Sequence, residues 1–540
     1  MKILTWFKSH YYIILPILLL SVISLMNFHS NQFIMGLDNI SPYFNSRAVL
    51  DKLFGSETGA VFANLPFLFT LPIFELLKLI SIPIWAINQL YLMFGLWMGV
   101  LGTGYLVYRI TKSKKGFLFG SVLSLANLAT FWIFNQPNYF FVAAFASIPW
   151  LMEWGIGKPE KNLVLTIIRI TAVILFFQTT MNLVVFISYL FAILLIQFAI
   201  NTSRVEWKSN LITQTKRLGI ILLILLIVWQ AGIFLTGKSD FVVSKLVTYY
   251  SSIKENPLTK AITKDLQASG IINNNIVNNI VFKNSWVETH TTEGIRLFQS
   301  YDYYSGPIFL IGLIPFVLAL STLFNSDRQK KIPLHFALIV GLILMSSIML
   351  KATQGVPVLS EAFRWSASKF WPLIIFPIIL LATDSLVTLK RPLITGIVFG
   401  LLLIYILPMF TGNLFSKELV TKLPGEYFKL DNNIKSETLY YYLPAPQDLY
   451  FYTYKFGYFG SDFVSYMTKG DTQKTGILSY FNNVERYKSI SKSLVNCESK
   501  IENIKIIWDS NVETGSNIIK NCLDSKYNLT SKDRGLYIYE

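Results

Sequence analysis

The chain has 540 residues, of which 53% are hydrophobic and only 14% are charged, and its formal net charge is +16. A soluble protein would carry about 25% charged residues, so the composition excludes a purely soluble chain and favours one helical membrane body for most of the length. The basic residues lie in short clusters between apolar runs, which is typical of inner loops of membrane proteins and argues against nucleic-acid binding.

The first two apolar regions set the expected topology. Residues 11–28 follow two lysines and precede no small-residue cleavage site, so we expect a retained first helix with its N-terminus inside. Residues 61–80 are apolar but contain Glu75 and Lys78, whereas residues 84–108 are cleaner and end in the basic stretch RITKSKK. If both crossed, that stretch would lie outside, against the positive-inside rule. Residues 61–80 are therefore predicted to be interfacial or re-entrant.

Further apolar runs complete a prediction of about eleven spans, with the C-terminus outside. They are residues 117–134, 138–154, 163–180, 182–200, 218–236, 307–324, 333–350, 370–389 and 392–412. Arg169 and Asp384 lie in or near these spans, close to their inner ends, where we expect them to snorkel to the membrane surface.

The predicted organisation has two parts. Residues 1–412 form an all-α polytopic transmembrane domain with outer loops at 29–83, 237–306 and 351–369. Residues 413–540 form a small extracytoplasmic domain of the α/β or α+β class. Its strand candidates are the aromatic or β-branched stretches TLYYYLP, LYFYTY, NIKIIWD and GLYIYE, and residues 513–524 are expected to form a helix.

The chain has two cysteines, Cys497 and Cys522, and both lie in this C-terminal part. If that part is outside the cytoplasm, the two can form a disulfide. The alternative is a pair of unrelated buried thiols, and the sequence leaves both open.

Asp38, in the stretch FIMGLDNISPYFNSR, is the first candidate for chemistry. A carboxylate near the membrane surface can act as general base for an acceptor hydroxyl, and Asn39 can help to position it. Gly36 allows the backbone to turn close by. The alternative is that Asp38 caps a helix that begins at Ile40–Ser41–Pro42.

Arg364 and Lys369, in SEAFRWSASKFWPL, are the second candidate. They precede a predicted span, and Arg and Lys are both suited to binding phosphate. The alternative is plain contact with lipid headgroups.

The second outer loop carries a third cluster in WVETHTTEGIRLFQSYDYYSGP. Its ionisable candidates for substrate binding are His290, Glu293, Arg296 and Asp302. His290 could be a base, although a lone histidine more often has a structural role. The sequence contains no HExxH, CxxC or P-loop motif, and we assign no metal ligand.

Together, GLDNISPYFN, AFRWSASKF, and LPGEYFKL with the TLYYYLPAP and YKFGYFGSDFVSY stretches resemble motifs of the GT-C superfamily of polyprenyl-phosphate-dependent glycosyltransferases. Within it they resemble the branch of YfhO-like proteins and the GT-C domain of α-(1→3)-arabinofuranosyltransferases. The usual Trp of the first motif is Leu37 here. The D-x-D or E-x-D form of metal-using relatives is absent, because Asp38 is followed by Asn39 and Ile40, so a divalent metal is left open.

The resemblance implies a glycosyltransferase at the outer face of the cytoplasmic membrane. It would transfer a sugar from a polyprenyl-phosphate donor to an envelope glycan, glycolipid or glycoprotein, with Asp38 as base and with Arg364 and Lys369 at the leaving phosphate. The C-terminal domain would bind acceptor glycan. Three alternatives stay open: an O-antigen ligase or polymerase that uses loop 237–306, a lipid or glycan transporter, and a non-catalytic scaffold.

Overall fold

A computed structural model of the chain separates into two compact units. The helical unit comprises Met1–Phe28, Leu92–Ala231 and Ser239–Phe415, and the sheet unit comprises His29–Tyr91, Gly232–Lys238 and Ser416–Glu540. The structure describes residues 2–36, 45–46, 70–156, 162–181, 183–202, 212, 216, 219, 276–283, 298–325, 327–353, 363, 366–434, 438–444, 451–457, 459–461, 464–467, 476–478, 484–497, 501, 504–513 and 517–540.

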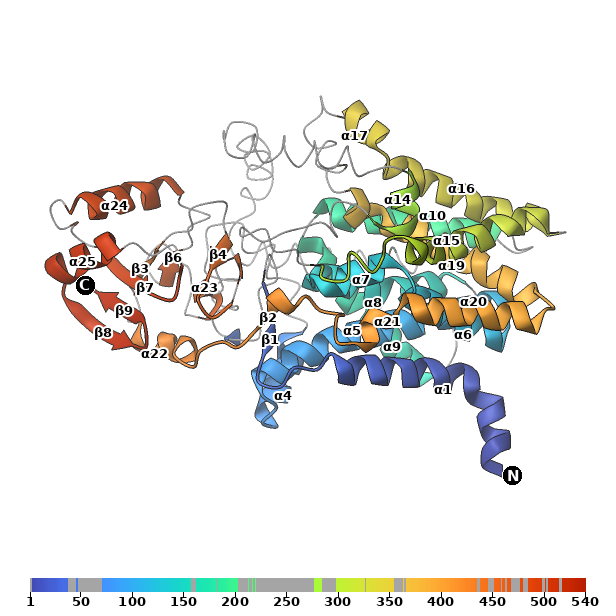
Figure 1. Ribbon diagram of the computed structural model, residues 1–540, viewed down its shortest axis with the longest axis horizontal. Helices are drawn as coiled ribbons and strands as arrows, with labels where there is room; N and C mark the ends of the chain where they lie inside the picture. The colour runs from blue at the N-terminus through green and yellow to red at the C-terminus, as the bar shows by residue number, and fades with distance from the viewer. Residues whose placement is uncertain are drawn as a thin grey trace. The chain divides into compact units, whose positions relative to one another are not determined.

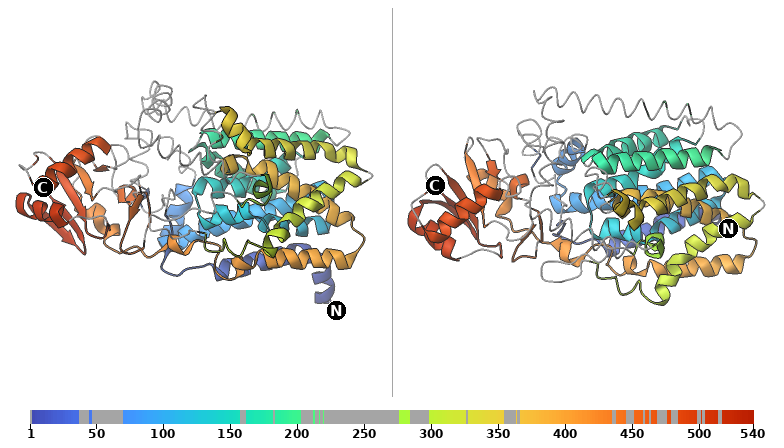
Figure 2. Two further views of the ribbon diagram at one scale, coloured as in Figure 1. Left: turned by 45° about the horizontal axis from the view of Figure 1, so that its top comes forward. Right: turned by 90° about the horizontal axis from the view of Figure 1, so that it is seen from above.

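The helical unit consists of apolar helices that run alongside one another (Figures 1 and 2). The longer helices are α1 (Lys2–Met26), α5 (Ile84–Thr111), α6 (Lys114–Leu125), α8 (Tyr139–Trp154), α9 (Leu163–Phe177), α10 (Leu183–Thr202), α15 (Pro307–Ser321), α16 (Arg328–Leu344), α19 (Ser366–Thr388) and α20 (Pro392–Tyr405). Shorter helices are α7 (Leu128–Asn135), α14 (Ile276–Val281), α17 (Ser347–Thr353) and α21 (Leu407–Phe410). Helix α19 packs against α6, α10, α15 and α16, and nearly all of its residues are buried, so it lies in the core of this unit.

Several helices have the length and composition of membrane spans. In the described part of the chain, four meet both criteria: Ile84–Thr111, Val184–Thr202, Pro307–Phe324 and Ser366–Thr388. The bent pair α6 and α7 would make a fifth if it counts as one span. Shorter apolar helices occupy His10–Met26, Tyr139–Trp154, Leu163–Phe177 and Pro392–Tyr405. The chain is therefore a helical membrane protein, whereas the number eleven stays a prediction, and expected span 218–236 lies outside the described residues.

The predicted span at 117–134 corresponds to two helices with a break between them. Helices α6 and α7 meet at a bend of 55°. Asn127 lies at the bend, where its side chain accepts a hydrogen bond from the Thr130 amide at 2.9 Å and donates to the Ser124 carbonyl at 2.7 Å. A single asparagine therefore satisfies main-chain groups that a continuous helix would pair itself, which makes the break tolerable in an apolar setting.

The sheet unit contains a five-stranded mixed sheet of order β6–β3–β7–β9–β8. The strands are β3 (Leu439–Leu443), β6 (Gly476–Leu478), β7 (Lys505–Asp509), β8 (Leu529–Asp533) and β9 (Leu536–Tyr539). Strand β3 is parallel to β6 and β7, and the remaining pairs are antiparallel. A two-stranded sheet pairs β4 (Phe451–Thr453) with β5 (Phe459–Ser461). All four predicted strands are present, and the predicted helix corresponds to α25 (Asn517–Lys526).

The two faces of the large sheet have separate cores. Because side chains alternate along a strand, Tyr441 and Leu443 of β3 face one core, and Tyr440 and Tyr442 face the other. Helices α24 (Val484–Asn496) and α25 cover the first face, as Figure 1 makes clear. The second face packs against residues from distant parts of the sequence, namely Phe33, Met35, Leu423, Tyr427, Leu430, Ile434, Tyr454, Val464, Met467 and Val512.

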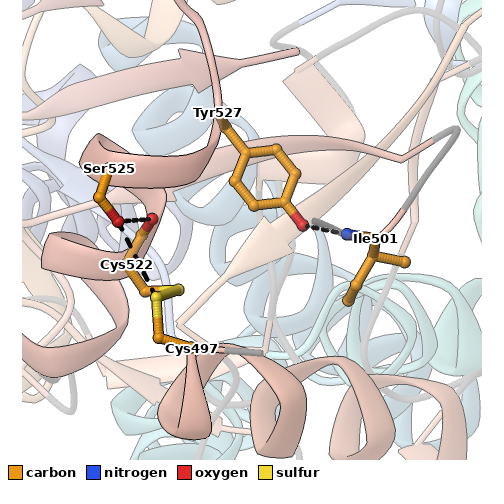
Figure 3. Close-up of a disulfide and its surroundings, with 5 residues drawn as sticks. All are labelled: Cys497, Ile501, Cys522, Ser525 and Tyr527. Atoms are coloured by element: carbon orange, nitrogen blue, oxygen red, sulfur yellow. Dashed lines mark hydrogen bonds between the residues drawn. A yellow bond between two sulfur atoms is a disulfide. The ribbon is translucent and has the colours of Figure 1, made fainter. Parts of the chain in front are cut away.

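A disulfide joins Cys497 to Cys522, which confirms that the two cysteines can pair (Figure 3). Their Cα atoms are 5.4 Å apart, within the range that a disulfide spans. Cys497 directly follows α24, and Cys522 lies in α25, so the bond ties together the two helices that cover one face of the sheet. Tyr527 accepts a hydrogen bond from the Ile501 amide at 3.0 Å close by.

Candidate functional site

The predicted site residues differ in how far the structure describes them. Lys369 and Asp302 belong to the helical unit and are described. Asp38, Asn39, His290, Glu293, Arg296 and Arg364 lie outside the described residues. The convergence of Asp38 with Arg364 and Lys369 therefore stays a prediction.

The start of the first loop is a strand bound along both of its edges. Strand β1 (Phe33–Ile34) pairs antiparallel with β2 (Val420–Thr421), and the Met35 amide donates to the Leu419 carbonyl at 2.9 Å. On the opposite edge, the Ile34 amide donates to Asn88 Oδ1 at 2.8 Å, and Asn88 Nδ2 donates to the Ile34 carbonyl at 3.3 Å. The asparagine side chain thus takes the place of a second neighbouring strand.

Gln89 holds the segment before β1 in a similar way. Its Oε1 accepts from the His29 amide at 2.8 Å, and its Nε2 donates to the carbonyls of His29 at 2.6 Å and Gln32 at 2.8 Å. Asn88 and Gln89 are both fully buried near the start of α5. Sequence reasoning missed them, although two adjacent amides in an apolar run were a visible signal.

Lys369 lies in the first turn of α19 and is only 4% exposed. Its surroundings are fixed by neighbouring polar contacts of the helical unit. The Tyr189 hydroxyl donates to the Ser368 carbonyl at 2.7 Å, and Trp371 Nε1 donates to the Tyr189 oxygen at 3.0 Å. Lys369 is therefore buried in the first turn of a helix and does not lie on an exposed loop, while its role in phosphate binding stays a prediction.

Asp302 is exposed and sits in a turn that is docked firmly on the helical unit. The Tyr304 hydroxyl donates to the Tyr405 carbonyl at 3.0 Å at the end of α20. Lys283 Nζ donates to the Tyr304 carbonyl at 3.1 Å and to Ser305 Oγ at 2.8 Å. These contacts fix the last part of the second loop.

The sheet unit contains a buried carboxylate that sequence reasoning did not single out. Asp509, which is fully buried, accepts hydrogen bonds at 2.6 Å from the hydroxyls of both Tyr427 and Tyr442, and at 2.8 Å from the Asn511 amide. Burial raises the pKa of Asp509 to about 6, although these donors oppose the shift. The Tyr442 and Tyr454 hydroxyls also bond to each other at 2.8 Å.

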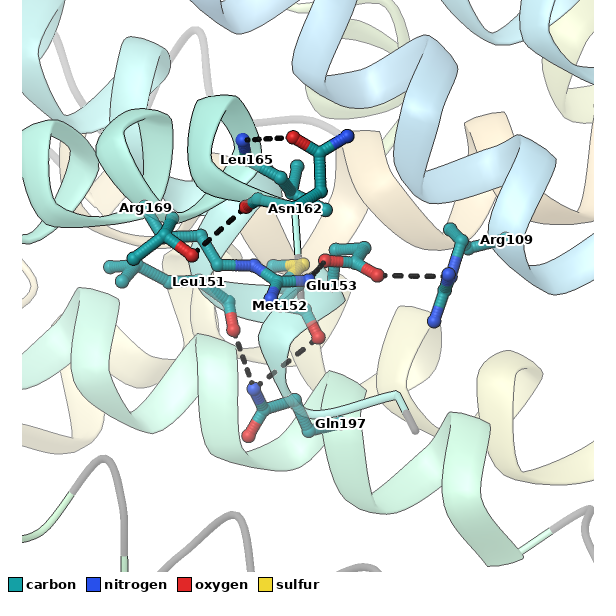
Figure 4. A network of polar contacts seen from close by, with 9 residues as sticks. Arg109, Leu151, Met152, Glu153, Asn162, Leu165, Arg169 and Gln197 are labelled. Atoms are coloured by element: carbon teal, nitrogen blue, oxygen red, sulfur yellow. Dashed lines mark hydrogen bonds and ion pairs between the residues drawn. The ribbon is translucent and has the colours of Figure 1, made fainter. Parts of the chain in front are cut away.

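A buried ionic cluster lies in the helical unit (Figure 4). The Glu153 carboxylate pairs with Arg109 Nε at 3.0 Å and with Arg169 Nη2. The prediction that Arg169 snorkels is wrong: it is 5% exposed, because Glu153 offers a charged partner inside the protein. Asp384 instead pairs with Lys331 at 2.7 Å and stays partly exposed. Within the described residues, no three His, Cys, Asp or Glu side chains gather as a metal site would require.

Comparison with known proteins finds structural likeness only. No protein-family model matches the chain, and no curated protein matches it. Among the solved structures that match are two cryo-EM classes of a mutant arabinofuranosyltransferase AftD from mycobacteria. One aligns with a TM-score of 0.57 at 10% identity over 98% of this chain and 41% of that one. The other aligns with a TM-score of 0.52 at 11% identity over 97% and 41%.

The chain thus spans less than half the length of these structures, and at such identity the likeness concerns the fold alone. The chain therefore shares the overall fold of these two structures, whereas its membership of the GT-C superfamily and of its arabinofuranosyltransferase branch stays a prediction. The resemblance to YfhO-like proteins stays a prediction.

Proposed function

We propose that the chain is a membrane glycosyltransferase that takes its sugar from a polyprenyl-phosphate donor. The observation that carries the proposal is the alignment of 98% of the chain with the fold of an arabinofuranosyltransferase. The GLDN stretch around Asp38 and the FRWSASKF stretch around Lys369 support it from the sequence. Arabinofuranose is the first sugar to test, and the acceptor would be a glycan, glycolipid or glycoprotein of the cell envelope.

In the proposed reaction, Asp38 removes the proton of an acceptor hydroxyl as its oxygen attacks the anomeric carbon. The bond between that carbon and the phosphate oxygen breaks, and the lipid phosphate leaves with the bonding electron pair. A single displacement of this kind inverts the anomeric configuration. Asn39 would orient the Asp38 carboxylate, and such general base catalysis contributes about 10²–10⁴-fold to rate.

Arg364 and Lys369 would stabilise the negative charge that grows on the departing phosphate. The burial of Lys369 supports this role, because a cation in a water-poor setting stabilises developing charge more strongly than one in bulk water. His290, Glu293, Arg296 and Asp302 of the second loop would contact the sugars. The docked turn around Asp302 gives that loop one fixed end.

We place the sheet unit outside the cytoplasmic membrane, with the N-terminus inside. The disulfide between Cys497 and Cys522 supports this orientation, because disulfides persist in oxidising compartments and are rare in the cytoplasm. In this position the sheet unit would bind acceptor glycan, while the lipid part of the donor would reside in the bilayer beside the helical unit.

The test uses the full chain in lipid nanodiscs with synthetic farnesyl-phosphate arabinofuranose and, in parallel, other farnesyl-phosphate sugars. Envelope glycan fragments serve as acceptors, and released farnesyl phosphate and extended glycan are measured by mass spectrometry. We expect both products with at least one donor. Turnover that depends on His290 and Arg296 but not on Asp38 would instead favour a ligase-like enzyme that uses the second loop.

A further inference from the structure

We infer that Asn88 and Gln89 are positioning residues for the transfer reaction, because they fix the first residues of the first outer loop. The inference rests on the proposed function, because that loop carries Asp38. The first residues of α5, up to Tyr91, belong to the sheet unit, and both side chains are fully buried there. Each side chain is directed at the main chain of the first loop. Between them they make five hydrogen bonds to three loop residues: His29, Gln32 and Ile34.

The geometry at Ile34 resembles strand pairing. Asn88 accepts from the Ile34 amide and donates to the Ile34 carbonyl, as a neighbouring strand would. On the other edge, Met35 pairs with Leu419, so consecutive residues are held from opposite sides. A buried main-chain amide or carbonyl that loses its hydrogen-bond partner destabilises the folded arrangement, so truncation of Asn88 should release this edge of the strand.

The side chains of the same segment are anchored as well. Phe33 and Met35 are buried in the core that contains Tyr427 and Tyr442, and Ile84 and Trp85 at the start of α5 pack against that core. The segment before Asp38 is thus held by hydrogen bonds, by strand pairing and by apolar burial at once. Such a combination of contacts is expected for a segment that must hold the side chain of Asp38 at a defined position.

Asp38, the proposed general base, follows the anchored residues 33–35 closely in the sequence. Gly36 lies in a β-bridge next to the anchored residues, and its φ of 145° favours glycine. Two further residues reach at most about 7 Å. Because Asp38 follows Ile34 by only four residues, we expect a small shift at Ile34 to displace the carboxylate of Asp38. A displacement of about 1 Å at a reacting group can cost roughly a hundredfold in rate.

The alternative is that the two amides only stabilise the fold, and Gln197 provides the matched control. It is a buried amide on α10 whose Nε2 donates to the Leu151 carbonyl at 2.9 Å and to the Met152 carbonyl at 3.4 Å. Gln197→Ala removes the same kind of bond within the helical unit. A general loss of stability would affect this variant and Asn88→Ala alike.

The experiment compares Asn88→Ala, Asn88→Asp, Gln89→Ala and Gln197→Ala in nanodiscs. Asn88→Asp keeps the acceptor for the Ile34 amide and serves if the alanine variant fails to fold. Hydrogen exchange of peptides covering residues 29–36 reports the anchor directly and needs no substrate. Turnover of farnesyl-phosphate arabinofuranose, or of whichever farnesyl-phosphate sugar is used, separates kcat from KM.

We expect faster exchange at residues 29–36 in the Asn88 and Gln89 variants, and unchanged exchange there in Gln197→Ala. For Asn88→Ala we expect kcat to fall roughly a hundredfold while the donor KM stays within about twofold. Unchanged exchange, or a normal kcat despite faster exchange, would overturn the inference. Asp38→Asn is assayed alongside the wild-type chain. Absence of turnover by the wild-type chain with every donor would reject the proposed function, and normal turnover by Asp38→Asn would reject the general-base role of Asp38. An inactive Asp38→Asn beside a fully active Asn88→Ala would reject the positioning role alone.

Discussion

The Tyr442 hydroxyl donates a 2.6 Å hydrogen bond to the fully buried carboxylate of Asp509, in the core of the sheet unit. Tyr427 makes a second bond of the same length to the same oxygen. The phenols stay neutral at ordinary pH, because burial and the neighbouring carboxylate raise the pKa of each. The cluster therefore carries at most one charge, which is that of Asp509.

This cluster predicts a pH dependence of stability. The pKa of Asp509 is raised from its ordinary value of 3.8 to about 6, so the folded state holds the proton more tightly than the unfolded state. The contribution of Asp509 to the free energy of unfolding is fully present below about pH 4 and is lost as pH rises through about 6. The free energy of unfolding changes by about 3 kcal/mol over this range. We expect Asp509→Asn to remove this part of the dependence in thermal melts from pH 4 to 8. Equal pH dependence in both proteins would contradict the assignment.

The disulfide predicts both a chemical and a thermodynamic result. Cys497 and Cys522 close a loop with a sequence separation of 25 residues, and a bond of this kind stabilises a domain by about 2–4 kcal/mol. The Cys497→Ser, Cys522→Ser double variant should lower the melting temperature of the sheet unit. A membrane-impermeant maleimide should label intact cells only after reduction. Labelling of two thiols without a reductant would contradict the bond.

The ionic cluster of the helical unit predicts an asymmetry between two carboxylates. Glu153 is 1% exposed and holds Arg169, so Glu153→Gln should destabilise the protein by about 3–5 kcal/mol. Asp384 pairs with Lys331 near the surface, and Asp384→Asn should cost less than about 1 kcal/mol. Melting in detergent is the measurement. Equal effects of the two variants would mean that burial does not decide the strength of these pairs.

The topology predicts opposite sides for two reporter fusions. The basic stretch that ends at Lys115 should lie inside, and the chain after Asn413 should lie outside. Alkaline phosphatase and green fluorescent protein fused after Lys114 and after Asn413 give complementary signals. Reporters on the same side would reject the orientation and, with it, the placement of the sheet unit.

Much of the fold follows from local patterns. The apolar runs predicted most of the helices, and the aromatic, β-branched stretches predicted β3, β4, β7 and β9, because hydropathy and β-propensity are properties of neighbouring residues. The bend at Asn127 was not predicted, because an average of hydropathy over many residues does not detect a single capping side chain. The burial of Arg169 was not predicted, because its partner, Glu153, belongs to another helix.

The contacts that hold the start of the first loop could not be predicted from local sequence patterns, for a similar reason. Asn88 acts on Ile34, 54 residues away, and β1 pairs with β2 from the far end of the chain. The sequence near Asp38 does not predict these partners. The motif around Asp38 suggested a reactive residue, and only the fold reveals what holds the segment in front of it.

The most direct test of the account is the activity of Asp38→Asn in nanodiscs with a farnesyl-phosphate sugar donor and a glycan acceptor. Asparagine keeps the size of the side chain but cannot accept the proton, so we predict a loss of turnover of about 10²–10⁴-fold with an unchanged melting temperature. Asp384→Asn, a carboxylate variant outside the proposed site, should keep normal turnover. Transfer at the normal rate by Asp38→Asn would contradict the general-base mechanism.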